Sequence, residues 1–127
     1  LADVALPTFD DEVALWGDTS PHATLGRLST LGVTEIAVKL GPKGALLSHR
    51  GSVAEVPVPA AITAIDTTAA GDSFNAGYLA ARLSSMEPTA AALHGHRLAG
   101  CVITHRGAIV PHEATAAVIA PLPRRGA

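Results

Sequence analysis

Hydrophobic residues form short, closely bounded runs in the first half of the chain. The runs 1–7 and 35–40 each predict a buried strand, and the second contains the β-branched residues that favour one. Turn residues at 41–44 lead into a further run, 45–49, which predicts a hairpin-like pair with the strand before it. Valines interleaved with prolines at 53–59 predict an edge strand or extended arm, since proline cannot donate to a central ladder.

Helical spacing and helix-end signals predict four helices around these strands. The first follows the N-cap candidate Thr8, runs through residue 16 with acidic residues in its first turn, and stops at Gly17. The second follows the cap signal at 18–20, which ends in Ser20, has Pro21 at an early position, repeats leucines at helical spacing and closes at Gly32. Hydrophobic residues again recur at helical spacing from Ser73, and Pro88 opens a fourth helix that runs to about residue 104.

This order of strands and helices predicts an α/β fold in which no connection is long enough to be a domain linker. The composition is 48% hydrophobic with a mean hydropathy of +0.33, which excludes a disordered chain. No apolar run approaches the roughly 20 residues of a membrane span, and the start lacks signal-peptide features. We therefore expect a cytoplasmic protein with no membrane partner, and a frayed tail at 121–127.

Charge and the metal-binding residue types narrow the function classes further. The net charge is −2 and only nine Lys and Arg are spread along the chain, so the electrostatic footprint of a nucleic-acid binder is missing. The single cysteine, Cys101, lies in an apolar stretch and is predicted to be a core residue. The six histidines lack metal-ligand spacing and are predicted to be surface or cap residues; His94 and His96 diverge on a helix, and His105 suits a helix C-terminus.

Residues 66–72, DTTAAGD, join an extended run at 62–65 to a helix and gather small side chains where the backbone turns. The first amides of a helix lack internal partners and the helix dipole is positive there, so small side chains let these N–H groups approach a phosphate. Asp72 lies beside that position, where a carboxylate can accept a proton from an attacking hydroxyl. The alternative is that Asp72 only caps a helix beginning near Ser73.

The string DTTAAGDSFNAGYLA resembles the C-terminal signature of the ribokinase-like sugar kinases, the PfkB carbohydrate kinase family, written DTxGAGD with a following FxxG. VKLGPKGALL at 38–47 and GCVITHRGAIVP at 100–111 are similar to two further family segments, in the same order. LPTFDDEVALWGD and the DTTAAGDSF variant look most like the 2-keto-3-deoxygluconate kinases, although ribokinases and fructokinases share much of this pattern. The resemblance implies a ribokinase-like doubly wound sheet, with residues 1–127 as its C-terminal nucleotide-binding portion only.

The resemblance implies an ATP-dependent kinase that phosphorylates 2-keto-3-deoxygluconate at its primary hydroxyl, using ATP, Mg²⁺ and a monovalent cation. Asp72 would be the catalytic base. The anion hole around the transferred phosphoryl group would use the backbone amides of Ala69, Ala70 and Gly71. The loop implied to border ATP contains Lys39, Gly41, Lys43 and Gly44. The monovalent cation would lie near Asp66 and a carbonyl near Thr68.

The chain departs from the family pattern at two places. Ala69 stands where most members have glycine, which is harmless if its φ is negative. The family's NxxE motif, associated with the magnesium-bound phosphates, is replaced by residues 8–11 or 9–12, whose acids also suit an ordinary first helical turn. Two further plain alternatives stay open: the glycines at 41–44 form only a tight turn, and Asp66 only caps neighbouring amides.

Other functions compete with the kinase hypothesis. The residues at 71–74, GDSF, superficially resemble the block of GDSL esterases with Ser73 as nucleophile, but the chain has no D-x-x-H pair to support it. A non-catalytic nucleotide-binding module is the second alternative. The family's sugar-binding half and lid are absent, so we expect the chain alone to be inactive and to keep at most a nucleotide half-site. An open sheet side favours association, including a homo-oligomer.

Overall fold

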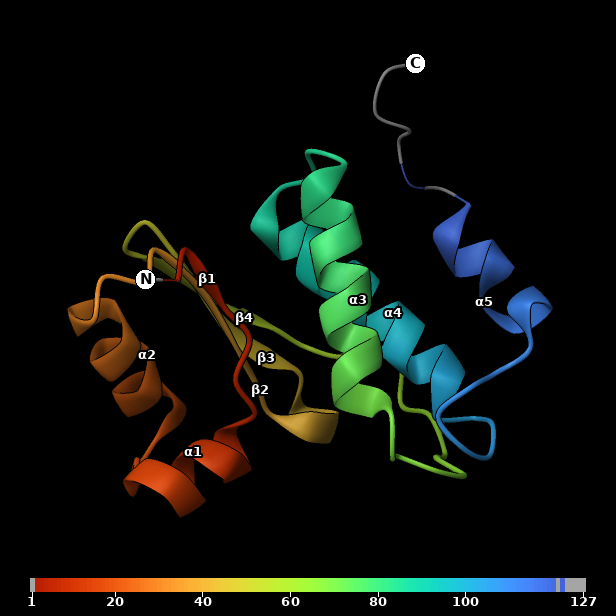
Figure 1. The fold of residues 1–127 in the computed structure, drawn as a ribbon, viewed down its shortest axis with the longest axis horizontal. Coiled ribbons are helices and arrows are strands. Elements are labelled where there is room, and N and C mark those ends of the chain that lie inside the picture. Colours follow the sequence, from red (N-terminus) through yellow and green to blue (C-terminus); the bar gives the residue numbers. More distant parts are fainter. Residues whose placement is uncertain (1, 121, 123–127) are drawn as a thin grey trace. The chain divides into compact units, whose positions relative to one another are not determined.

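The computed structural model describes residues 2–120 and residue 122, which form two compact units, 1–57 and 58–127 (Figure 1). The first unit combines a sheet with two helices, and the second is built from three helices. The tail predicted to fray, 121–127, lies outside the described residues except for Leu122. Within the described part, none of the helices is both long and apolar enough to cross a membrane.

The first unit contains a four-stranded mixed sheet in the order β1-β2-β3-β4. Its strands are β1 (Val4–Ala5), β2 (Glu35–Lys39), β3 (Ala45–His49) and β4 (Ser52–Val56). β1 pairs in parallel with β2, and the two following pairs are antiparallel. The predicted hairpin and the edge strand are therefore confirmed, and β4 ends immediately before Pro57.

The helices α1 (Phe9–Trp16) and α2 (Pro21–Thr30) connect β1 to β2. Leu25 of α2 packs with three strand residues, Ile36, Val38 and Leu46, and all four side chains are buried. Ile36 and Val38 are two positions apart in β2, so their side chains face the same side of the sheet. Phe9 also packs against this cluster, so both helices cover one face of the sheet.

The helix ends follow the predicted signals closely. Ser20 caps α2, because its hydroxyl accepts a hydrogen bond from the amide of Ala23 at 3.1 Å. Gly17 ends α1 in the left-handed conformation, with φ 72°. Thr8 occupies the predicted N-cap position of α1, but its side chain makes no cap hydrogen bond.

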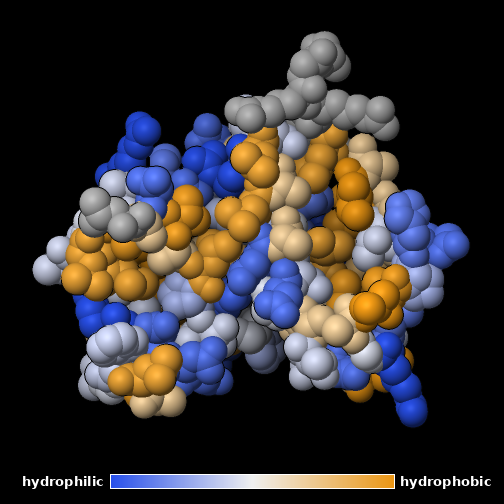
Figure 2. All heavy atoms as spheres, in the orientation of Figure 1, coloured by the Kyte–Doolittle hydropathy of each residue, from blue (hydrophilic) through white to orange (hydrophobic). Residues whose placement is uncertain are grey.

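One strand prediction was wrong in extent. Among the described residues of the run 1–7, only Val4–Ala5 form a strand, and Val4 is 37% exposed because β1 is an edge of the sheet. The extended run at 62–65 lies outside the sheet; the amide of Ile65 donates to the carbonyl of Ile103 at 2.8 Å. Hydrophobic side chains also reach the surface of the molecule (Figure 2), and those of Leu15 and Trp16 in α1 are among the exposed ones.

The second unit consists of α3 (Ala70–Leu83), α4 (Pro88–Val102) and α5 (His112–Ile119), and α3 packs closely along α4 (Figure 1). A Cβ added to Gly77 would lie 3.0 Å from the Cα of Gly95, so the two helices approach backbone to backbone. Phe74 and Tyr78 are buried beside this contact with their rings stacked at 5.9 Å. The sequence pattern did not predict α5, whose N-cap position holds Pro111 and carries no side-chain cap.

The turn between β2 and β3 requires glycine at its end. It forms a short 3-10 helix, Gly41–Lys43, followed by Gly44 with φ +98°. A Cβ on Gly44 would lie 2.3 Å from the carbonyl oxygen of Val56. Both the backbone angle and the space therefore exclude a larger residue.

Gly44→Ala should destabilise the first unit more than the matched change Gly51→Ala. Gly51 also has a positive φ, of +85°, but a Cβ there meets nothing within 4 Å, so only backbone strain is added. We expect Gly44→Ala to lower the free energy of unfolding by about 1–3 kcal/mol more than Gly51→Ala, because it also overpacks the turn. Urea denaturation measures the difference, and equal losses would contradict this role of Gly44.

Candidate active site

The helix α3 begins earlier than the hydrophobic pattern predicted, and this places Asp72 in its first turn. The N-cap position belongs to Ala69, whose methyl group cannot cap the helix, and the helix runs from Ala70. The alternative in which Asp72 caps a helix beginning near Ser73 is therefore wrong. Asp72 is exposed, so its carboxylate is accessible to a reacting group.

The backbone around Asp72 leaves N–H groups without partners. The first intrahelical hydrogen bond runs from the amide of Ser73 to the carbonyl of Ala69, at 2.9 Å. The amide of Ala70 is used in a turn with the carbonyl of Thr67, at 3.1 Å. Among the described residues, no acceptor takes the amides of Gly71 and Asp72. These unpaired amides, at the positive end of the helix dipole, suit an anion.

The geometry around Ala69 agrees with the sequence analysis on one point and refines it on another. Its φ is −105°, so alanine in place of the family's glycine adds no backbone strain. Of the three residues predicted to form the anion hole, Ala69 and Gly71 have amides with no acceptor in the described part of the chain. The amide of Ala70 is already bonded, whereas that of Asp72 extends the unpaired set.

Asp66 organises the turn that leads into α3. Its Oδ1 accepts hydrogen bonds from the amide and the hydroxyl of Thr68, and its Oδ2 accepts one from the amide of Gly107 at 2.9 Å. These bonds, that of the Thr68 hydroxyl foremost, lower the pKa of Asp66 to about 2. Both oxygens of the Asp66 carboxylate therefore accept hydrogen bonds from the protein itself. The monovalent cation near Asp66 and Thr68 stays a prediction.

The residues predicted to border ATP all lie in the first unit, at one end of the β2–β3 hairpin. Lys39 ends β2, and Lys43 is exposed at the end of the 3-10 turn. Gly41 has φ +59° with open space around it, so the turn conformation alone favours glycine there. The structure thus groups the predicted residues into two sets, this turn and the start of α3 in the second unit.

The acidic residues at the start of α1 divide into two kinds. Asp10 and Asp11 are exposed in the first helical turn, where their charge favours the helix. Glu12 pairs with Arg27, which also contacts the buried Asp18 at 2.8 Å. The Arg27 hydrogen bond is the main reason that the pKa of Asp18 is lowered. Glu12 therefore helps to join α1 to α2.

Over residues 2–120 and 122, no three His, Cys, Asp or Glu side chains gather as a metal site.

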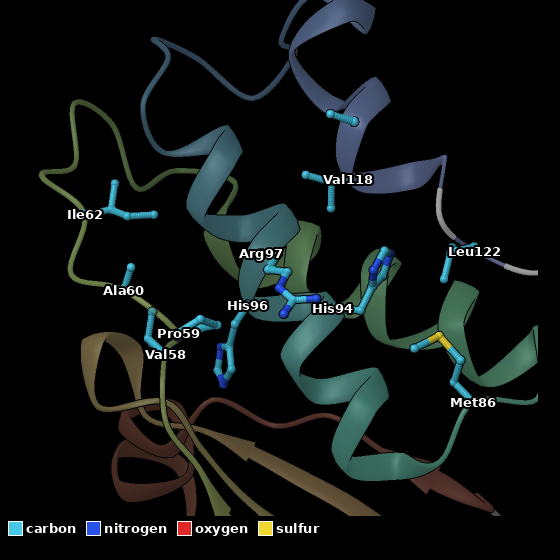
Figure 3. A pocket seen from close by; sticks show the side chains of 11 residues that line it. Val58, Pro59, Ala60, Ile62, Met86, His94, His96, Arg97, Val118 and Leu122 are labelled. Carbon is cyan, nitrogen blue, oxygen red and sulfur yellow. The ribbon is translucent and has the colours of Figure 1, made fainter.

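A pocket of about 420 Å³ lies in the second unit, between the segment that leads to Ile62, α4 and α5 (Figure 3). Aliphatic side chains form most of its wall, and three basic side chains of α4 contribute the polar groups. Its lining residues are Val58, Pro59, Ala60, Ile62, Met86, His94, His96, Arg97, Ala117, Val118 and Leu122. The volume falls in the range of small-molecule sites.

The pocket corrects the prediction that the histidines are surface or cap residues. His94 and His96 are only 5% and 7% exposed, because α4 is covered on more than one side. The Nε2 of His94 is buried with no hydrogen-bond partner, and burial, then the Arg97 charge, lower the pKa of His94. The His96 ring packs 5.0 Å from that of Phe74. The sequence pattern did not reveal this burial, because it depends on the segments that pack around α4.

The end of α4 agrees better with the predictions. A ring nitrogen of His105 lies 3.1 Å from the carbonyl oxygen of Cys101, as expected of a residue at a helix C-terminus. Cys101 itself is half-buried, not a full core residue, because its thiol faces α5 and contacts the carbonyl of Ala114 at 2.9 Å.

The contact between Asp66 and Gly107 should persist in mild acid. The folded pKa, about 2, lies below the ordinary value of 3.8, so this carboxylate stabilises the fold above that value. The stabilisation is lost as the pH falls through about 2. Carbon-13 NMR of the Asp66 carboxyl measures the midpoint. A midpoint near 3.8 would mean that the three hydrogen bonds are absent in solution.

Comparisons with known proteins show which sequences this chain is similar to. The chain is 47% identical over 116 residues to a 2-dehydro-3-deoxygluconokinase of Escherichia coli K12, covering 88% of the chain and 37% of that relative. It is 43% identical over 113 residues to the enzyme of the same name from Haemophilus influenzae, covering 85% of the chain and 35% of that relative. The chain thus spans little more than a third of the length of these curated relatives.

Solved structures confirm the predicted ribokinase-like α/β fold. The crystal structure of a ribokinase from Thermotoga maritima superposes with a TM-score of 0.76 at 30% identity, covering 93% of the chain and 42% of that protein. The sequence pattern of the "pfkB family carbohydrate kinase" matches residues 1–115, which include both predicted site segments. The chain therefore belongs to the pfkB family of carbohydrate kinases.

Proposed function

We propose that residues 1–127 are the C-terminal, nucleotide-binding portion of an ATP-dependent kinase that phosphorylates 2-keto-3-deoxygluconate at its primary hydroxyl. The observation that carries this proposal is the start of α3, where unpaired amides of Gly71 and Asp72 adjoin the exposed Asp72 carboxylate. The two named 2-dehydro-3-deoxygluconokinases, at 43% and 47% identity, support this sugar acid as the substrate. A cytoplasmic location and a homo-oligomer remain predictions.

The chemistry needs two groups that this segment supplies. Asp72 would accept the proton of the sugar hydroxyl as its oxygen forms a bond to the γ-phosphorus and the bond to the ADP oxygen breaks. The unpaired amides of Gly71 and Asp72 would donate hydrogen bonds to the phosphoryl oxygens, whose charge they stabilise during transfer. Mg²⁺ would supply further neutralisation of the phosphates. Residues 8–11 or 9–12 replace the NxxE motif that the family associates with the magnesium-bound phosphates.

The pocket of the second unit is the place we propose for the adenine base of ATP. Its wall is mainly aliphatic, which suits a flat aromatic ring, and His96 and Arg97 provide polar groups. Ile62, in its wall, is only four residues before Asp66, so one short segment joins the pocket to the turn that starts α3. The base and the phosphates would then bind to the same unit.

Two related functions remain to be separated from this one. A ribokinase of Haemophilus influenzae is 35% identical over 77 residues, which keeps ribose as a competing sugar. A nucleotide-binding module without catalysis is the other candidate, because the chain covers 37% of the longer E. coli relative. We propose that residues 1–127 alone bind nucleotide but do not catalyse phosphoryl transfer, since no residue in this range is assigned to position a sugar.

The test is ADP release by the full reading frame and by the 127-residue chain, with ATP and Mg²⁺ and a panel of sugars. We expect release only from the full protein, with 2-keto-3-deoxygluconate preferred over ribose and fructose. In the full protein, Asp72→Asn should lower turnover by about 100-fold or more, the range that general-base catalysis supplies. ATP affinity should stay nearly unchanged, because this substitution leaves the backbone amides in place.

Ser73→Ala is the matched control for this experiment. Ser73 is adjacent to Asp72 and would be the nucleophile of the competing esterase hypothesis. The change should spare phosphoryl transfer. If ATP affinity in Asp72→Asn fell as much as turnover, Asp72 would be a structural or metal-linked residue and not the base. If ADP were released only with ribose, the proposed substrate would be wrong and ribose would take its place.

Ala60→Trp tests the position proposed for the base. Ala60 lines the pocket and is exposed, so an indole there fills the space without disturbing the core. Ala61→Trp is the control, because Ala61 is also exposed but is not part of the wall. Isothermal titration calorimetry should show ATP affinity reduced by about tenfold or more in Ala60→Trp only. Equal affinities in the two variants would exclude this pocket.

A further inference from the structure

We propose that Asp66 is a positioning residue that ties the start of α3 to the end of α4 and so aims the unpaired amides at the transferred phosphoryl group. This inference rests on the proposed function. It concerns the hydrogen bond between the Asp66 carboxylate and the amide of Gly107, two residues that lie 41 positions apart in the chain.

The segment before α3 is attached to the end of α4 at two points. The amides of Ile65 and Asp66 both donate to the carbonyl of Ile103, at 2.8 and 3.1 Å. That carbonyl follows the last helical residue of α4, where acceptors have no helical partner. The second point is the bond from the Gly107 amide to Oδ2 of Asp66, at 2.9 Å. The two points prevent the segment from pivoting about either one.

The other carboxylate oxygen fixes the turn itself. Oδ1 of Asp66 accepts from the amide and the hydroxyl of Thr68, which fixes the chain direction two residues further on. The next hydrogen bond, from the amide of Ala70 to Thr67, starts the helix. One carboxylate therefore connects the α4 end, through its two oxygens, to the turn from which the amides of Gly71 and Asp72 project.

Further along its length, α3 packs closely against α4. Gly77 and Gly95 bring α3 and α4 into backbone contact, and a Cβ on Gly95 would lie 2.9 Å from the carbonyl oxygen of Phe74. The start of α3 is thus fixed by packing along the helix and by Asp66 at its approach. Because stabilisation of a transferred group depends on the placement of its donors, loosening one attachment should affect turnover more than ground-state binding.

Asp66→Asn separates the two functions of the carboxylate. The side-chain oxygen of the introduced asparagine can still accept from Thr68, but its NH₂ group would face the Gly107 amide, and two donors cannot bond. Thr68→Val does the opposite: it removes the hydroxyl bond and keeps the bond to Gly107. Glu113→Gln is the control for loss of an exposed acid, since Glu113 lies in the first turn of α5.

The experiment measures kcat and KM for ATP in the full reading frame, together with hydrogen exchange of the peptides covering 66–72 and 103–110. We expect Asp66→Asn to lower kcat by about 10- to 100-fold, the cost of a small misplacement, with KM changed by less than about threefold. Thr68→Val should lower kcat by less than about fivefold. Exchange at both peptides should rise in Asp66→Asn, and Glu113→Gln should match the wild type.

The outcomes separate this inference from the proposed function. Unchanged kcat in Asp66→Asn with faster exchange would overturn the positioning role, because the link would then be only structural. Unchanged exchange would overturn the link itself. If the wild type transferred phosphate to no sugar, the proposed function would fail, and exchange would decide alone: faster exchange at both peptides in Asp66→Asn supports the link, and exchange at 103–110 alone contradicts it.

Discussion

Unsatisfied backbone N–H groups at the start of α3 are the constraint on which the proposed function depends. A helix leaves its first amides without internal partners, and most helices meet this need with a side-chain cap or with water. Here the N-cap position is Ala69, which has no cap to offer, and the amides of Gly71 and Asp72 have no acceptor among the described residues. Small side chains at these positions keep the amides accessible, so an external anion is the natural partner.

The surrounding structure holds this helix end in place. The close contact of α3 with α4 depends on Gly77 and Gly95, because a Cβ on either would collide with the opposite helix. The end of α4 in turn holds the approach to α3 through the carbonyl of Ile103 and the amide of Gly107. In the proposed function, packing and hydrogen bonding would both hold the amide donors in place, since a preorganised donor stabilises a developing charge better than a mobile one.

Local signals made much of the fold predictable. The Ser20 cap, the Gly17 stop and the glycine turn at 41–44 lie within a few residues of the elements they define, and the structure confirms each of them. The helix α5 and the early start of α3 escaped prediction because neither has a capping side chain. The burial of His94 and His96 is decided by what packs around α4, which helical spacing alone does not reveal.

The candidate site shows the same division. The DTTAAGD segment was enough to predict Asp72 and the amides beside it as site residues, because the proposed chemistry depends on consecutive residues. The contact between Asp66 and Gly107 could not be found this way, since it joins residues far apart in the sequence. The sequence also did not show that the Ala70 amide is bonded while those of Ala69 and Gly71 have no acceptor in the described part of the chain, because the turn that uses the Ala70 amide depends on the backbone path through Thr67.

The most direct measurement follows the amide NMR signals of Gly71 and Asp72 while the nitrogen-15-labelled chain is titrated with ATP and Mg²⁺. We predict that both signals shift progressively and saturate together, because their N–H groups become donors to the phosphates. The amide of Ala70, already bonded to Thr67, should move less. Saturable ATP binding that leaves the Gly71 and Asp72 signals in place would contradict the claim that these amides hold the phosphates.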